Sequence, residues 1–351
     1  MIKHFILCFV SVFSLSCMGY CENSFATHPS VLQTIEQIQS TRNYLPTLPP
    51  YIPSKAAWIF VDRSNPKQLF TLNLIIPPAW KSLPSVGAAL SVQAPQDIPL
   101  PLNRNYESIF RAGPNATPLS EVLVSNPLLS GLFVEFAPYF DVTQSDIKIP
   151  GGLTYTALHE GFHHNAQFSK SSWAWNLDDL KMPRSDSAVC IDSKNTFISK
   201  EYTALGNVWD QLAAGATPTT LKKTWRTWND ARELRIANIP EVVHPGNTPT
   251  NCRNMDRMYH RVEGLADYAA FSTLAQLKTV KIDEVRDFYR KVILDHPSET
   301  PALEFGFYAS GSAYAFLLER INPSGEWKTR VIEDSQSSLA ELTAEYMNLI
   351  P

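Results

Sequence analysis

The most constraining feature of the sequence is the uneven distribution of its proline residues. Of 26 prolines, 16 lie between Pro46 and Pro150 of the 351-residue chain. Proline cannot donate a backbone hydrogen bond, and it interrupts helices and central strands. We therefore expect a strand-and-loop lobe at residues 22–150 and a mainly helical lobe at residues 151–351, joined as one unit because no linker composition separates them. The expected fold class is α+β.

Hydrophobic periodicity indicates where the individual elements lie. Short runs of β-branched and aromatic residues predict strands, and apolar residues repeating every three to four positions predict helices. The predicted strands are 57–61, 69–76 and 132–136. The predicted helices are 30–39, 153–168, 200–214, 218–236, 255–277, 282–294 and 310–321. Pro138 restricts the strand at 132–136 to an edge or an end of its sheet; as an edge it could bind an extended peptide, although an ordinary core strand is also compatible.

Residues 1–21 have the pattern of a secretory signal peptide. Lys3 is followed by 11 apolar or small residues, 5–15, and then by further small residues. This stretch is too short to span a bilayer, and no later segment is long and apolar enough to do so. We therefore expect an exported protein, periplasmic or secreted. The alternatives are a buried N-terminal helix and a lipid anchor at Cys17, because residues 14–17 loosely resemble a bacterial lipobox.

Export determines how the remaining cysteines are interpreted. Beyond the signal region the chain contains only Cys190 and Cys252. In an oxidising compartment, two such cysteines most simply form one disulfide. The alternative is a pair of unrelated buried thiols.

The most specific motif is His-Glu-Gly-Phe-His at residues 159–163. On a helix, His159 and His163 are spaced i and i+4, so their imidazoles lie on one face and can converge on one Zn²⁺. Glu160 lies about 100° further round the helix, where a base would hold a metal-bound water. Gly161 is unusual inside a helix and suggests close approach of another backbone or of a substrate. The alternative is a helix with two solvated histidines.

A catalytic zinc needs a third protein ligand, and His164 points about 100° away from His163. The segment 261–268 offers two carboxylates, Glu263 and Asp267, at positions i and i+4. One could bind the metal while the other accepts the free N–H of a ligand histidine. The alternatives are Glu201 as the third ligand and a solvated helix face, although the small and apolar residues around Glu263 favour a buried helix.

HExxH followed downstream by ExxxD resembles the gluzincin branch of the zincin metallopeptidases. The resemblance implies that His159, His163 and Glu263 bind zinc, with Glu160 as the general base and Asp267 supporting a ligand histidine. It also implies a zincin-like fold, in which a small N-terminal twisted sheet with a substrate-binding edge strand precedes a mainly helical lobe. The separation between the two motifs is longer than in compact members of this family.

Gluzincins also use a tyrosine or a histidine to stabilise the oxyanion. Tyr308, expected just before a helix, is the first candidate. Tyr314 and His260 are the alternatives, and His260 is expected to share the helix face of Glu263, which lies three residues later.

Together these features predict an exported zinc metallopeptidase that acts on a peptide or protein by means of a zinc-activated water, with Glu160 as general base. A net charge of −4, from 30 basic and 34 acidic residues, argues against a nucleic-acid partner. Two other hypotheses remain. The first is a catalytically inactive zinc-binding module of the same fold that recognises a protein or peptide, against which the intact Glu160 argues. The second is an exported structural protein with an accidental motif.

Overall fold

The computed structural model describes the parts of the chain that build the predicted site. These are residues 29–49, 51–56, 58–62, 65–73, 81–86, 89–93, 109–111, 132–136, 149–167, 196–238, 252–295, 300–333 and 337–351. The predicted signal peptide at 1–21, including Cys17, lies outside the described residues. Cys190 and the side chain of Cys252 also lie outside them, and so does the predicted disulfide.

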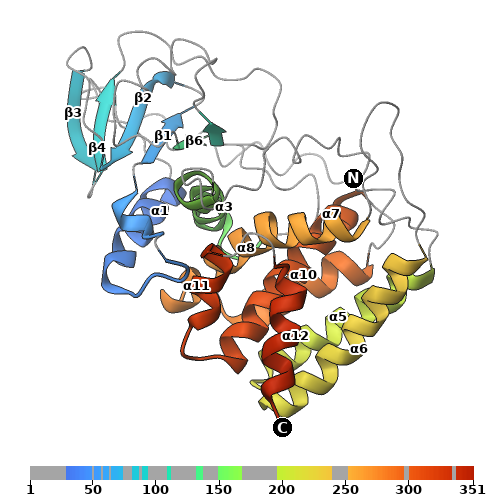
Figure 1. Cartoon of the computed structure of the whole chain (residues 1–351). Helices are drawn as coiled ribbons and strands as arrows, with labels where there is room; N and C mark the ends of the chain where they lie inside the picture. The colour runs from blue at the N-terminus through green and yellow to red at the C-terminus, as the bar shows by residue number, and fades with distance from the viewer. Residues whose placement is uncertain are drawn as a thin grey trace, which may run out of the picture.

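Six described strands form one sheet in the order β3-β4-β2-β1-β6-β5, above the helices in Figure 1. Their bounds are Trp58–Asp62 (β1), Asn65–Leu72 (β2), Lys81–Val86 (β3), Ala89–Gln93 (β4), Ile109–Arg111 (β5) and Leu132–Phe136 (β6). β1 and β6 are parallel, whereas the other neighbouring strands are antiparallel. The three predicted strand ranges overlap with β1, β2 and β6.

Residues 132–136 were expected at an edge or an end because of Pro138; in the described sheet they are not an edge strand, but the strand does end before this proline. β6 pairs with β1 on one side and with β5 on the other. β6 ends at Phe136, two residues before Pro138, so the proline lies outside this strand. The described edges are β3 and β5.

In the described residues from Gly151 onward helices dominate, as predicted. The α-helices of the described chain are Pro29–Ser40 (α1), Gly152–Phe162 (α3), Thr196–Ala213 (α5), Pro218–Ala237 (α6), Cys252–Tyr259 (α7), Leu265–Gln276 (α8), Ile282–Arg290 (α9), Thr300–Ile321 (α10), Glu326–Glu333 (α11) and Leu339–Leu349 (α12). Three π-helical turns interrupt or extend them: His163–Gln167 (η4), His260–Gly264 (η7) and Lys291–Asp295 (η8). α11 and α12 were not predicted, and α10 begins at Thr300 rather than at residue 310.

α8 and α10 lie near the centre of the helical part (Figure 1). Nearly every residue of α8 from Leu265 to Leu274 is buried, as its small and apolar residues predict. The turn η7 approaches α10 backbone to backbone, because a Cβ added to Gly264 would lie only 2.3 Å from the Cα of Gly311. This contact fixes the segment that contains Glu263 against a central helix.

α3 lies on the sheet side of α8, next to α1 (Figure 1). The hydroxyls of Thr34 on α1 and Thr154 on α3 are hydrogen-bonded at 2.9 Å. Gly151 directs the chain into α3 with a φ of +88°, and a side chain there would also collide with Leu274 of α8, whose Cδ1 would be 2.5 Å away. Glycine at this position therefore allows the motif helix to start directly against α8.

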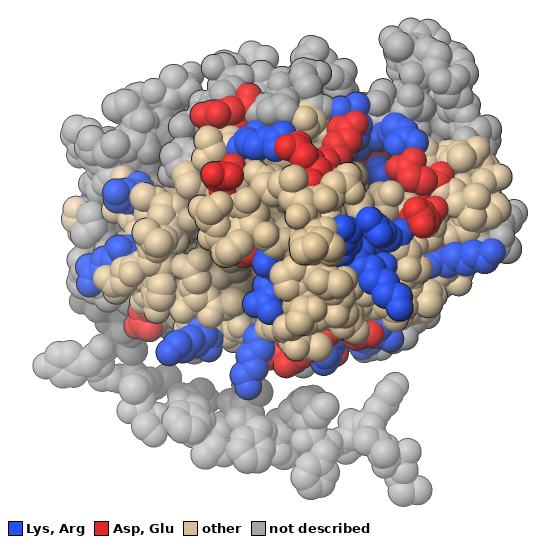
Figure 2. Space-filling view, turned by 60° about the horizontal axis from the view of Figure 1, so that its bottom comes forward, with Lys and Arg blue, Asp and Glu red and all other residues tan. Residues whose placement is uncertain are grey.

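The surface of the described residues carries charges of both signs. On the face in Figure 2, Lys and Arg are scattered with Asp and Glu among uncharged residues. This distribution agrees with the near balance of 30 basic and 34 acidic residues. Of the helices that the structure describes, none combines the length and apolar character needed to cross a bilayer.

Candidate metal centre

The two histidines of the motif lie at the junction of α3 and η4. His159 lies in the last turn of α3, and His163 is the first residue of the π-helical turn. Both are buried, and their rings meet edge to face with centroids 4.8 Å apart. The imidazoles therefore point into the protein. The alternative of a helix with two solvated histidines is wrong.

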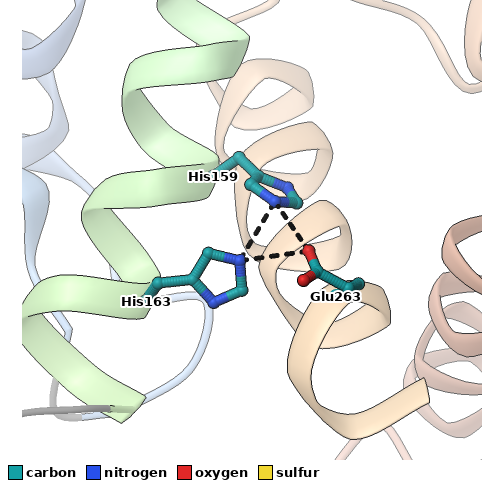
Figure 3. Close-up of side chains that lie close together, drawn as sticks. All are labelled: His159, His163 and Glu263. Carbon is teal, nitrogen blue, oxygen red and sulfur yellow. Dashed lines mark hydrogen bonds and ion pairs between the residues drawn. The ribbon is translucent and has the colours of Figure 1, made fainter. Parts of the chain in front are cut away.

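Glu263, from η7, completes a triangle of donor atoms (Figure 3). Its Oε2 lies 3.3 Å from Nε2 of His159 and 3.2 Å from Nε2 of His163. The two Nε2 atoms are 3.1 Å apart. The structure thus brings together the three predicted ligands, and this group could hold a metal ion.

Asp267 lies behind His159 and is completely buried. Its Oδ1 is 2.7 Å from Nδ1 of His159 and also accepts a hydrogen bond from the hydroxyl of Tyr155. Its Oδ2 accepts one from Tyr289. Burial and the charge of Asp267 raise the pKa of both tyrosines, which keeps them as donors. Asp267 therefore occupies the supporting position expected for it, with its lone pairs held by three donors.

Gln167 lies behind His163 in the same way and was not identified from the sequence. Its Oε1 is 2.5 Å from Nδ1 of His163. Its Nε2 donates to the backbone carbonyls of Arg261 and Val262, at 2.9 and 3.1 Å. The spacing i, i+4 from a ligand histidine was the signal in the sequence that could have indicated it.

The two histidines and Glu263 stabilise one another's charged forms. Burial alone would lower the pKa of His159, but hydrogen bonds to Asp267 and Glu263 raise this pKa to about 10. Burial would also lower the pKa of His163, but the charge of Glu263 raises it above its ordinary value. Burial would raise the pKa of Glu263, but the two histidines hold it well below its ordinary value. The centre thus favours positive charge between these groups, which a metal cation can supply in place of the protons.

Glu160 directly follows the ligand His159 in α3. Unlike the two histidines, it is only partly buried. Its side chain is therefore not sealed inside the protein as the two imidazoles are. Its negative charge contributes to raising the pKa of both imidazoles.

Of the three candidates for an oxyanion donor, Tyr308 lies beside the centre. Its ring stacks on that of His159, with centroids 5.7 Å apart and an interplanar angle of 10°. Tyr308 lies within α10 and not before a helix, which corrects its predicted position.

The other two candidates lie elsewhere. Tyr314 is fully buried and packs against Trp228, with ring centroids 4.3 Å apart. His260 is buried against Tyr314. The expectation that it shares the helix face of Glu263 is wrong. A π-helical turn closes with i to i+5 hydrogen bonds and contains more residues than an α-turn, so residues three apart separate. Burial lowers the pKa of His260 to about 3, which leaves a neutral ring among charged groups.

Glu201 is not a ligand of the centre, and that alternative is wrong. It is buried and forms an ion pair with Arg235. Arg235 and Arg232 both bind Oδ2 of Asp256, at 2.6 and 3.0 Å. These two acidic and two basic side chains form a buried ionic cluster between α5, α6 and α7.

Glycine at position 161 is explained by neighbouring aromatic side chains. The expected close approach of another backbone or of a substrate is not the reason. A Cβ at this position would lie 2.4 Å from Trp58 and 2.5 Å from the hydroxyl of Tyr51. The Tyr51 ring also meets Phe162 edge to face, with centroids 5.6 Å apart. Gly161 therefore lets residues of the N-terminal lobe pack directly on the back of the motif helix.

The arrangement presents two nitrogen donors and one carboxylate oxygen, with a supporting side chain behind each histidine. Such a set can hold a divalent cation and leave a coordination position for another molecule. Comparison of the chain with protein-family models, with curated proteins and with solved structures gave no match.

Proposed function

We propose that this protein is an exported zinc metallopeptidase with a zincin-like fold of the gluzincin type. The observation that carries the proposal is the convergence of His159, His163 and Glu263 from segments 100 residues apart in the chain. A buried group of two imidazoles and a carboxylate is costly unless it binds a cation or a proton. The resemblance in sequence and the geometry of the donors thus support the same ligand set.

The distances between the donor atoms fit zinc. A tetrahedral zinc with bonds of about 2.0–2.1 Å places its ligand atoms roughly 3.3–3.4 Å apart. The observed distances are 3.1, 3.2 and 3.3 Å. Three protein ligands are the usual number in a catalytic zinc site, whereas a structural site has four. Zinc, when bound, would lower the pKa of a bound water to about 7 and polarise a carbonyl group.

The residues around the centre support hydrolysis. Glu160 can take a proton from the attacking water and deliver it to the leaving nitrogen of a peptide bond. Asp267 orients His159 through the 2.7 Å contact with Nδ1. Tyr308, stacked on His159, is the proposed donor to the oxyanion. A peptide or protein substrate is therefore the proposed partner.

The competing function is a zinc-binding module without turnover. Such a module would need the three ligands but not a partly exposed carboxylate next to His159. Glu160 favours the enzyme for this reason.

The Glu160→Gln variant separates the two functions. We expect the wild type to cleave a broad peptide library and the variant to lose about 10²–10⁴-fold in rate while keeping its zinc. Glu36→Gln, an exposed change on α1, is the matched control and should leave the rate unchanged. If wild type and variant hold zinc but are equally inert, the binding module replaces the enzyme; without zinc in the wild type, both metal functions fail.

Export and a Cys190–Cys252 disulfide are part of the same proposal. Expression with the native N-terminus should yield a chain that has lost about 21 residues, detected by mass spectrometry. Peptide mapping without reduction should recover the two cysteines in one linked pair. An unprocessed N-terminus would refute export, a lipid-modified Cys17 would favour the anchor, and two free thiols would refute the disulfide.

A further inference from the structure

Gln167 occupies a buried position between the two segments that supply the metal ligands. It is the last residue of η4, four residues after His163, and only 6% of its surface is exposed. Its side-chain amide contacts His163 on one side and the backbone of η7 on the other. These contacts determine which way the amide must face.

The two backbone carbonyls fix the orientation of the amide. The carbonyl oxygens of Arg261 and Val262 can only accept hydrogen bonds. The Nε2 of Gln167 lies 2.9 and 3.1 Å from them, so both of its protons are directed toward η7. The Oε1 atom must then face His163, because an amide flip would set an oxygen against two carbonyl oxygens.

This orientation in turn fixes the tautomer of His163. Oε1 of Gln167 is an acceptor, so Nδ1 of His163, 2.5 Å away, must be the donor. In the neutral imidazole, Nε2 then carries no proton, and its lone pair can bind a metal ion. This is the atom that lies 3.2 Å from Glu263 and 3.1 Å from Nε2 of His159.

We infer that Gln167 is a positioning residue that selects the metal-binding tautomer of His163 and ties this histidine to the turn that carries Glu263. The inference deepens the proposed function and rests on it. The two histidines are thus oriented by different chemistry. His159 is supported by the carboxylate of Asp267, whereas His163 is supported by a neutral amide whose direction the backbone of η7 dictates.

Two substitutions separate the positioning role from a purely structural one. Gln167→Met keeps the length of the side chain but removes both the acceptor and the donors. Gln167→Glu keeps an acceptor for His163 but loses the protons donated to Arg261 and Val262. Gln276→Met, at the far end of α8, removes a weaker glutamine contact of 3.5 Å to Thr47 and is the matched control. The dissociation constant for Zn²⁺ is measured in the full mature chain by competition with a chromophoric chelator, together with the melting temperature without metal.

We expect Gln167→Met to weaken Zn²⁺ binding about 10–100-fold and Gln167→Glu to bind at least about tenfold more tightly than the methionine variant. Both variants should melt at a lower temperature than the wild type, and Gln276→Met should bind Zn²⁺ normally. Wild-type affinity in Gln167→Met would overturn the inference and leave the proposed function standing. Equal losses of affinity in both Gln167 variants would also overturn it, because they would follow the loss of stability alone. A wild type that binds no Zn²⁺ would overturn the proposed function and this inference together.

Discussion

Replacing Gly264 by alanine should destabilise the fold and disturb the metal centre together. The added Cβ would lie 2.3 Å from Cα of Gly311, 2.6 Å from its carbonyl carbon and 2.9 Å from the nitrogen of Ser312, whereas ordinary contact begins at 3.4 Å. All three obstructing atoms belong to the backbone of α10, so no side chain can rotate away. The two segments must therefore separate by about 1 Å, and Glu263, the preceding residue, must move with η7.

The expected cost follows from this overlap. Overpacking of a tight core contact costs about 1–3 kcal/mol of stability. A displacement of about 1 Å at a catalytic group can reduce kcat/KM about 10²-fold. Urea denaturation of the metal-free protein measures the first effect, and peptide hydrolysis with a chelator competition assay for zinc measures the second.

Gly206→Ala on α5 is the matched control for this substitution. The nearest atoms to its added Cβ are the ends of the Arg290 and Leu294 side chains, at 3.3 and 3.4 Å, which can shift. Alanine should be neutral there, or stabilise the helix by up to about 1 kcal/mol. If Gly264→Ala has the stability to urea and the zinc affinity of the wild type, the close contact of η7 with α10 is wrong. If it loses stability but binds zinc normally, this packing does not position Glu263.

Three further changes test other parts of the structure. Asp267→Asn should weaken zinc binding about 10–100-fold in a chelator competition assay, because the carboxylate that orients a ligand histidine is lost; unchanged affinity would contradict that role. The pKa of His260 is lowered from 6.5 to about 3, so the unfolded chain binds more protons between these values. The free energy of unfolding should therefore fall as pH drops through this range, by up to about 1.4 kcal/mol per pH unit. In urea denaturation of the metal-free protein, His260→Leu should make this dependence on pH less steep. An equally steep dependence in the variant would show that the ring titrates normally. Arg235→Met should lower the free energy of unfolding by about 3–5 kcal/mol, because Glu201 stays buried without its partner. Adding Glu201→Gln should recover part of this loss. Equal stability of the wild type and the single variant would mean that the ion pair does not form.

Local sequence patterns were sufficient for the elements whose character is set within a few residues. The apolar spacing of α5 and α6 identified these helices within a few residues. The HExxH and ExxxD spacings selected a ligand set whose donor atoms lie 3.1–3.3 Å apart in the structure. The HExxH pattern was informative because i and i+4 positions share a face on an α-helix, and His163 directly follows α3.

Long-range contacts explain the predictions that failed. Glu201 could not be recognised as the partner of Arg235, 34 residues away in the chain, from its own surroundings in the sequence. Gln167 was missed because its role depends on backbone carbonyls 94 and 95 residues later. The position of His260 was mispredicted because the π-helical turn η7 replaced the expected α-helical periodicity. In each case the deciding partner came from another part of the chain or from an irregular turn.

The most direct measurement is anomalous diffraction at the zinc absorption edge from crystals of the purified mature protein. We expect one anomalous peak per chain, about 2.0–2.1 Å from Nε2 of His159, Nε2 of His163 and an oxygen of Glu263. The absence of a peak, or a peak whose ligands do not include Glu263, would contradict the proposed metal centre.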